Sequence, residues 1–307
     1  MGADVAKALL KQAVGYKGNP ALVDTHRIIP KTEGGEYTQG NFVVLTPVAH
    51  MQEHGIYRER DETLDNIKSI VDDRRQVMKL VMKVQNQLLA YERNVDTLHE
   101  QTRGWLQSQL ESLQAELVIR EKALAKSVKE YAKEDALTAA ALGVRGVGPV
   151  TVAHMLTYID IEKARHASSL WAYAGLDKAS HERYEKGTAS GGNKTLRTAL
   201  YTMADSQVKS RGAYREVYDR MKDRLAQSEK ITKSRNTQGK LIECAWKDTK
   251  PSHRHGAAMR AVMKHFLADW WYVARTLAGL PTEALYPEAI LGGNHRTIMP
   301  EERGWEY

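Results

Sequence analysis

Apolar residues recur at alternating spacings of four and three along the middle of the chain. One run extends from Val77 to Leu98 and a second from Leu106 to Tyr131, with polar residues between the apolar positions. This spacing places the apolar side chains on one face of an α-helix, and a seven-residue period is typical of a coiled coil. No proline interrupts residues 61–148. The pattern therefore predicts a long, coiled-coil-like helical spacer over residues 59–135.

A narrow apolar stripe of this kind needs a partner helix to cover it. Gly104, beside Trp105, is the weak point of the segment, and it indicates either a kink or the turn of an antiparallel helical hairpin. An unbroken helix of about seventy residues would be about 100 Å long. We expect a homodimer or a higher oligomer through this segment, and a rigid spacer is the alternative.

A different pattern precedes the spacer. An apolar run from Ala21 to Ile29 is stopped by Pro30, and a second β-prone run, Phe42 to Leu45, follows a turn-rich segment that contains a Gly-Gly pair. Pro47 then suits the first turn of a helix. The order predicted for this part is strand, loop, strand, helix.

Polar residues with metal-binding chemistry follow the same periods. Asp24 and His26 are two residues apart, so they share one side of a strand. His50 and His54 are four apart, so they stack on one helix face. If the hairpin packs on the helix, the carboxylate and the imidazoles can hold a divalent metal. One histidine then stays free as a base, and the Asn41 amide can orient its ring.

His26 with the following Ile-Ile-Pro, the Gly-Gly pair, Asn41, His50 and His54 resemble the HNH, or ββα-metal, endonucleases. The resemblance implies that His26 is the general base and that Asn41 orients it. It implies that Asp24, His50 and His54 bind one Mg²⁺ or Mn²⁺ ion for hydrolysis of DNA. In the family the two first residues are often adjacent, whereas Thr25 separates Asp24 from His26 here.

The composition and net charge of the chain limit the kinds of partner that it can bind. The chain has 307 residues, which is room for two or three domains, and its net charge of +7 favours a polyanion such as DNA. Cys244 is the single cysteine, which excludes an internal disulfide and fits the cytoplasm. No apolar run approaches the roughly 18 residues that a membrane span needs, and we expect no signal peptide.

A glycine-rich turn, Gly143 to Gly148, lies between two helical runs. Backbone N–H groups at Gly146 and Gly148 can approach a phosphate closely, and the helix that begins near Pro149 adds its positive end. We interpret the turn as a helix-hairpin-helix motif that grips the DNA backbone. Its predicted contacts are Arg145, Gly146, Gly148 and Thr151.

Two further segments, Leu170 to Leu176 and Gly192 to Tyr201, resemble the C-terminal domain of the bridge-RNA-guided insertion-sequence transposases. The resemblance extends from about residue 136 to 278. It implies that a serine after the Ala-Gly-Leu segment attacks a DNA phosphodiester, and Ser180 is nearest to that place, with Ser190 further along. It also implies DNA and a guide RNA as partners. That family has an RuvC-like domain, and here the HNH-like module stands in its place.

Basic residues extend the predicted DNA surface. Lys194 and Arg197 belong to the second of these segments, and Arg254 opens a later helix. Residues 209–250 are basic and helix-prone, and we expect them to line a nucleic-acid groove.

The sequence therefore predicts a mainly α protein with a small α+β module. Its parts are an HNH nuclease module (1–58), the helical spacer (59–135), a helical DNA-binding domain (136–279) and an irregular tail (280–307). The predicted function is metal-dependent endonucleolytic cleavage of DNA, in a phage or mobile-element setting. Two alternatives stay open: a transposase or recombinase that uses a C-terminal serine and an RNA guide, and a non-catalytic DNA-binding protein with a decayed nuclease.

Overall fold

The computed structural model describes residues 24–29, 40–45, 61–93, 100–177, 191–235, 238–282 and 298–307. The chain divides into two compact units, Met1–Asp61 and Glu62–Tyr307. Across the described residues the structure is mainly helical, as predicted, with two small antiparallel sheets. Within the described residues, no helix has an apolar stretch long enough to cross a bilayer.

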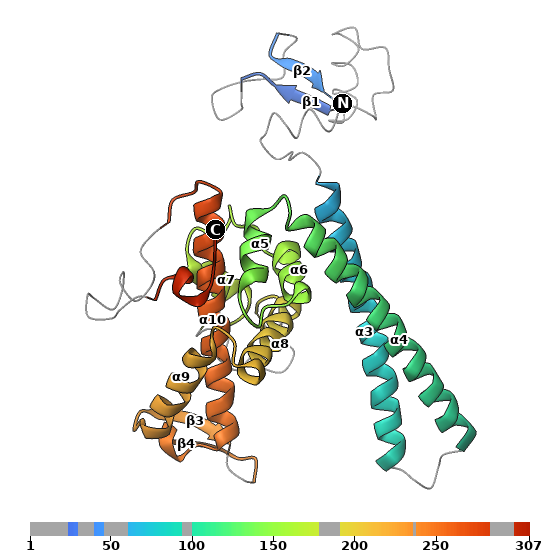
Figure 1. The fold of residues 1–307 in the computed structure, drawn as a ribbon, viewed down its shortest axis with the longest axis vertical. Coiled ribbons are helices and arrows are strands. Elements are labelled where there is room, and N and C mark those ends of the chain that lie inside the picture. Colours follow the sequence, from blue (N-terminus) through green and yellow to red (C-terminus); the bar gives the residue numbers. More distant parts are fainter. Residues whose placement is uncertain are drawn as a thin grey trace, which may run out of the picture. The chain divides into compact units, whose positions relative to one another are not determined.

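In the first unit, β1 (Asp24–Arg27) pairs with β2 (Phe42–Leu45) in an antiparallel hairpin (Figure 1). Asn41 bonds the start of the loop, because its Oδ1 accepts from the Ile29 amide at 2.7 Å and its Nδ2 donates to the Ile29 carbonyl at 3.3 Å. The two predicted strands are confirmed. The helix predicted from Pro47 lies outside the described residues, so the ββα-metal fold stays a prediction.

The second unit begins with two long helices, α3 (Glu62–Arg93) and α4 (Glu100–Tyr131), that lie side by side (Figure 1). They run antiparallel, since Asn66 Nδ2 of α3 lies 3.5 Å from Ser127 Oγ of α4, and further along α3 Arg74 Nη2 lies 2.6 Å from Glu121 Oε1, which comes earlier in α4. A small apolar cluster fills the seam between them. Its buried members are Val77, Val81, Val84, Leu106 and Leu110.

The apolar stripe of the spacer is thus covered within the chain. Of the alternatives, the antiparallel hairpin is confirmed and the unbroken 100 Å helix is wrong. The expected turn is misplaced, because Gly104 lies inside α4, where an exposed glycine costs only about 1 kcal/mol relative to alanine. The stripe no longer requires a second copy of the chain, and the oligomer stays a prediction.

The base of the α3–α4 hairpin joins the main core of the unit. Ile67 and Val71 from α3, with Leu124 and Val128 from α4, pack in the same buried cluster as α6 (Pro149–Tyr158). The other helices around this core are α5 (Ala136–Gly143), α7 (Ala167–Tyr173), α8 (Lys194–Ser210), α9 (Arg215–Gln227) and α10 (Pro251–Leu277).

Helix α10 is the central element of this core. It packs against α5, α7, α8 and α9, and it runs through the unit in Figure 1. Phe266, Trp270 and Trp271 are at most 2 % exposed and are among the largest buried side chains of the described residues. The long helix therefore has one face fixed in the core, which determines where its other residues lie.

Residues 228–235 and 238–250 form no α-helix, contrary to expectation. They contain an antiparallel ribbon, β3 (Ile231–Arg235) and β4 (Leu241–Ala245), followed by the short 3₁₀ helix η5 (Trp246–Asp248). Isoleucine and threonine favour a pleated strand, and Gly239 adopts φ +77° in the connection. The number of lysines and arginines obscured this strand pattern in the sequence.

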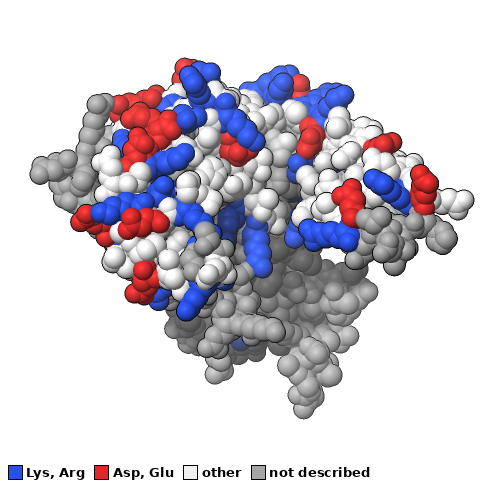
Figure 2. All heavy atoms as spheres, turned by 90° about the horizontal axis from the view of Figure 1, so that it is seen from below, with Lys and Arg blue, Asp and Glu red and all other residues white. Residues whose placement is uncertain are grey.

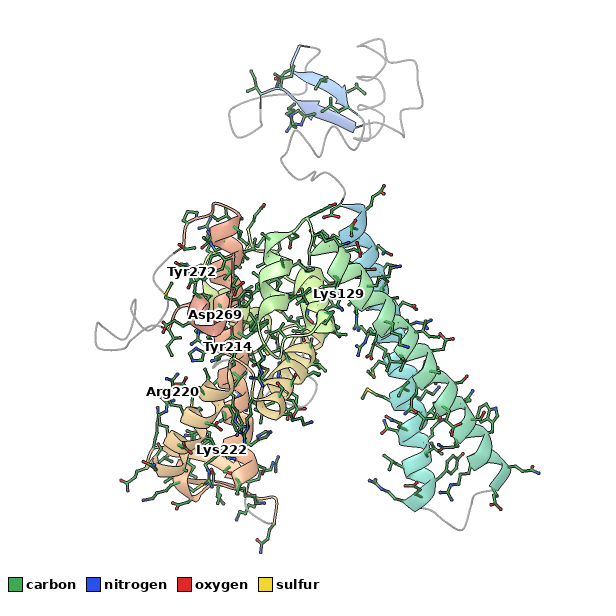
Figure 3. All side chains as sticks on the ribbon, viewed as in Figure 1. Lys129, Tyr214, Arg220, Lys222, Asp269 and Tyr272 are labelled. Carbon is green, nitrogen blue, oxygen red and sulfur yellow. The ribbon has the colours of Figure 1, made fainter. Side chains whose placement is uncertain are left out.

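The described end of the predicted irregular tail is folded onto α10. After the 3₁₀ helix η6 (Pro300–Arg303), Trp305 is buried in the core. Arg303 Nη1 donates to both Asp269 carboxylate oxygens at 3.0 and 2.9 Å, and Tyr214 Oη donates to Asp269 at 2.6 Å (Figure 3). Burial raises the pKa of Asp269 to about 6, although Arg303 and Tyr214 both favour the carboxylate.

This network predicts the effect of Arg303→Met. The Arg303 and Asp269 side chains are 6 % and 2 % exposed, so the change leaves an uncompensated buried carboxylate. Breaking such a pair from one side costs about 3–5 kcal/mol. Urea denaturation should show a loss of this size, whereas Arg103→Met, at an exposed position of α4, should change the unfolding free energy by less than about 0.5 kcal/mol. Equal stability of both variants would contradict a structural role for the ion pair.

Candidate nucleic-acid interface

The α5–α6 turn is held against the turn between α8 and α9. The Arg145 carbonyl accepts hydrogen bonds from Gln207 Nε2 at 3.0 Å and from the Ala213 amide at 3.3 Å. Gly146 has φ +87°, and a Cβ at this position would lie 2.7 Å from Gln207 Nε2. Packing within the protein therefore explains why position 146 requires glycine.

The other predicted contacts of this turn differ in access. Gly148 is the N-cap residue of α6 and has nothing within 4 Å of an added Cβ. Arg145 is exposed, and its Nη2 donates to the Ser210 carbonyl at 3.2 Å. Thr151 is only 7 % exposed. Gly146 and Thr151 thus contribute to packing, and DNA contact at this turn stays a prediction that depends on Arg145 and Gly148.

The junction of α7 and α8 explains two of the motif pieces. Gly175 and Gly192 have φ of +66° and +82°, and a Cβ on Gly192 would lie 2.6 Å from the Gly175 Cα. Arg197 holds both sides together, since Nε donates to the Ala174 carbonyl at 3.2 Å and Nη2 to the Gly191 carbonyl at 3.3 Å. The chain before residue 178 and after residue 190 is therefore brought together, and Arg197 has a structural role.

Two residues of the motif segment Gly192 to Tyr201 frame this junction. Asn193 caps α8 by accepting from the Leu196 amide at 3.0 Å, and its Nδ2 donates to Tyr173 Oη at 3.0 Å. Lys194 follows in the first turn of α8 and is exposed, so it is free to meet a polyanion. Ser180 and Ser190 lie outside the described residues.

Arg254 is engaged within the protein. Its Nη1 donates to the Lys247 carbonyl at 2.8 Å and to the Thr249 carbonyl at 2.5 Å. The guanidinium therefore satisfies carbonyls of the η5 segment and fixes that segment to α10. Its predicted phosphate contact stays a prediction.

The predicted nuclease residues lie in the first unit. Asp24 and His26 lie in β1, where His26 is half-buried and stands opposite Val43. Asn41 is 9 % exposed. His50 and His54 lie outside the described residues. Across the described ranges, no three histidine, cysteine, aspartate or glutamate side chains gather as a metal site, and the Mg²⁺ or Mn²⁺ site stays a prediction.

Positive charge alone does not mark an interface on the second unit. Figure 2 shows lysine and arginine side chains spread over the face on the β3–β4 side, with carboxylates among them. Several cations of the second unit are paired locally, as Lys209 is with Asp205 at 2.6 Å and Arg215 with Asp219 at 2.8 Å. The informative cations are those that the fold leaves without a counter-charge.

One such group lies on α10. His253, Arg260 and Lys264 are seven and four residues apart, so they share one face of the helix, which we call the α10 cationic face. The His253 ring stacks on Trp246 with centroids 5.0 Å apart, and Lys264 Nζ lies 5.2 Å from the Trp171 ring centroid. Sequence reasoning missed Arg260 and Lys264, although their helical spacing was visible.

Among the described residues, the α10 cationic face has little compensating negative charge. Burial lowers the pKa of Arg260, and burial and then the Arg260 charge lower the pKa of both Lys264 and His253. The Asp177 carboxylate offsets this only in part at Lys264. Arg260 makes no hydrogen bond or ion pair with any other residue in the described part of the chain. A half-buried cation without a partner is unfavourable, so the face is suited to an anion such as a phosphate.

Comparison with known proteins supports one of the two resemblances. Residues 139–219 match the model of a family described as Transposase IS116/IS110/IS902 family. The match begins in α5 and ends in α9. It confirms that the C-terminal part of the chain is transposase-like, and transposases are proteins of mobile elements. No curated protein matches the chain. Helix α10 lies beyond the matched residues but packs on α7, α8 and α9 in one core.

The α5–α6 turn generates a test of its two glycines. Gly146→Ala should destabilise the protein by about 1–3 kcal/mol, because the residue has a positive φ and its Cβ would meet Gln207. Gly148→Ala is the matched control, since its Cβ meets open space. Thermal unfolding would show a lower Tm for the first variant only. A tolerated Gly146→Ala would mean that the Gln207 contact does not require glycine.

Proposed function

We propose that this protein acts on DNA as a transposase or recombinase, with residues 62–307 holding the duplex. The observation that carries the proposal is the family match over residues 139–219, which covers the helices around the α7–α8 junction. The α10 cationic face gives that domain a means of binding the DNA backbone. A guide RNA is a further expected partner, because the resemblance to bridge-RNA-guided transposases implies one.

Arg260 is the central residue of the proposed backbone contact. A guanidinium presents a planar fork of donors that matches phosphate oxygens, and its burial strengthens the interaction. At 1.5 Å per residue, His253 and Lys264 lie about 16 Å apart along the α10 axis, with Arg260 between them. The face can therefore contact several phosphates of one strand. The Trp246 ring stacks on the His253 ring, and the Trp171 ring holds the Lys264 ammonium.

Arg260→Gln tests this contact. It should weaken binding to any duplex by about 10- to 100-fold at low salt, and it should reduce the slope of log affinity against log salt by about one. The Tm should not fall, because Arg260 has no ion-pair partner among the described residues. Fluorescence anisotropy across a salt series measures affinity and slope together.

Arg103→Gln is the matched control for Arg260→Gln, since it removes one exposed arginine from α4. It should leave affinity within about twofold of the wild type. If the two variants bind alike, the α10 cationic face does not contact the DNA backbone.

A serine between Gly175 and Gly192 is the proposed nucleophile, and Ser180 is the candidate that the resemblance implies. Attack of the serine oxygen on a backbone phosphorus forms a serine phosphodiester and releases a sugar oxygen, which takes up a proton. Two features support this role for the segment. Its two ends are brought together by the Gly175–Gly192 contact, and the Lys264 ammonium lies near Asp177 at its start.

HNH-type cleavage by residues 1–61 is the second candidate function. It is favoured by the β1–β2 hairpin, which has the predicted strands and holds Asn41 against the Ile29 backbone. His26 would take the proton from water, and Asp24, His50 and His54 would hold the ion. A bound Mg²⁺ or Mn²⁺ would supply charge stabilisation at the scissile phosphate.

The products separate the two chemistries. The serine route predicts a covalent protein–DNA adduct that survives detergent, that needs no added metal and that disappears in Ser180→Ala. The HNH route predicts cleavage with added Mg²⁺, no adduct and loss of activity in His26→Ala. Gel electrophoresis of a plasmid incubated with wild type and both variants measures each outcome.

Ser190→Ala is the control for the serine assignment. Loss of the adduct in Ser190→Ala but not in Ser180→Ala would transfer the nucleophile to the second serine. Cleavage that never yields an adduct and is abolished by His26→Ala would contradict the recombinase proposal and support the endonuclease.

A further inference from the structure

The β3–β4 ribbon has a surface that the described chain leaves uncovered. Ile231 is 62 % exposed and Leu241, on the same face, is 39 % exposed, whereas Ile242, on the other face, is 38 % exposed. The two strands hydrogen-bond to each other at one end of the second unit (Figure 1). An isolated two-stranded ribbon is marginally stable in water, so exposed isoleucines and leucine on such a ribbon indicate a partner.

The charge of the ribbon and its flanking residues indicates the charge of its partner. Residues 228–250 contain six basic and three acidic residues. Side chains alternate along a strand, so Lys233 and Arg235 share one face with Ile231, and the register places them opposite Glu243 and Leu241. A face that carries both basic and apolar groups fits the edges of DNA bases, which offer acceptors and thymine methyl groups.

The two basic residues of this face remain available. Lys233 lies 3.8 Å from Glu243, with both side chains more than 60 % exposed, and such a surface pair contributes little. Arg235 uses Nη1 to donate to the Gly239 carbonyl at 2.6 Å. A guanidinium has five N–H donors, so the other donors of Arg235 can reach a ligand.

The ribbon is fixed to the start of α10. The Trp246 amide donates to the Lys230 carbonyl and the Lys247 amide to the Ser228 carbonyl, both at 3.0 Å. Trp246 then stacks on His253, the first residue of the α10 cationic face. Trp246 therefore joins the base of the ribbon to the His253 end of the α10 cationic face, and a duplex bound along this face would pass close to the base of the ribbon.

The dimensions of the ribbon fit the major groove of DNA. Five residues per strand span about 17 Å at 3.4 Å per residue, and paired strands are about 5 Å apart. The major groove of B-form DNA is about 12 Å wide and admits a two-stranded ribbon, whereas the major groove of A-form RNA is too narrow for side chains to read.

We propose that the β3–β4 ribbon enters the DNA major groove, where Lys233 and Arg235 contact base edges, next to the backbone held by the α10 cationic face. This inference rests on the proposed function, because it assumes that the second unit binds duplex DNA. The ribbon would add contacts to the base edges to a surface that otherwise binds DNA through its charge.

The test compares a 30-base-pair DNA duplex with an RNA duplex of the same sequence. The double variant K233A/R235A should lose about 10- to 100-fold in affinity for DNA and stay within about twofold of the wild type for RNA. The control K163A/R103A removes the same two charges from exposed positions and should alter neither affinity. Circular dichroism checks that both variants keep their helix content, and methylation at guanine N7 reports on the major groove.

Each outcome decides between the ribbon and its rivals. Wild-type protection of guanine N7 that is lost in K233A/R235A supports the groove contact. An equal loss for DNA and RNA overturns it in favour of backbone contact, and a larger loss for RNA makes RNA the partner. Unchanged DNA binding by the double variant removes the ribbon from the interface but leaves the proposed function intact. A wild-type chain that does not bind DNA overturns both.

Discussion

Burial of one face of α10 is the interaction on which the second unit depends. Phe266, Trp270 and Trp271 lie in the core, and full burial of a large apolar side chain contributes about 1.5–3 kcal/mol. Trp271 Nε1 also donates to the Ala164 carbonyl at 2.7 Å, and Trp171 Nε1 donates to the Lys264 carbonyl at 3.0 Å. Because these contacts fix the rotation of the helix, they also fix the face on which the cations lie.

Close backbone approach accounts for the motif glycines of the transposase-like part. Gly175 meets Gly192, and Gly146 meets Gln207, in both cases at distances that a Cβ would not permit. Both contacts join segments that are separated in the sequence. The first joins the chain on either side of residues 178–190, and the second joins the α5–α6 turn to α8. The motif glycines thus fix the shape of the domain, and its chemistry depends on the residues that this shape brings to the surface.

Periodicity predicted the elements better than the site. The α3–α4 seam and the β1–β2 hairpin follow from their apolar spacing. Gly104, however, indicated the wrong position for the turn between the two long helices, and the basic residues obscured the strand pattern of the β3–β4 ribbon. Arg197 and Arg254 were expected to bind DNA because of their charge, and the structure shows both bonded to backbone carbonyls. Arg260 was missed for the opposite reason, since a missing counter-charge is a property of the fold and no sequence pattern records it.

Photo-cross-linking tests most directly whether DNA lies along the α10 cationic face. A duplex that contains 5-iododeoxyuridine is bound to the full chain and irradiated, and the cross-linked peptides are identified by mass spectrometry. If the face binds DNA, the cross-linked peptides come from residues 228–277, with those of α10 between His253 and Lys264 prominent among them. Cross-links confined to residues 1–61 or to the α3–α4 hairpin would show that DNA binds elsewhere on the protein.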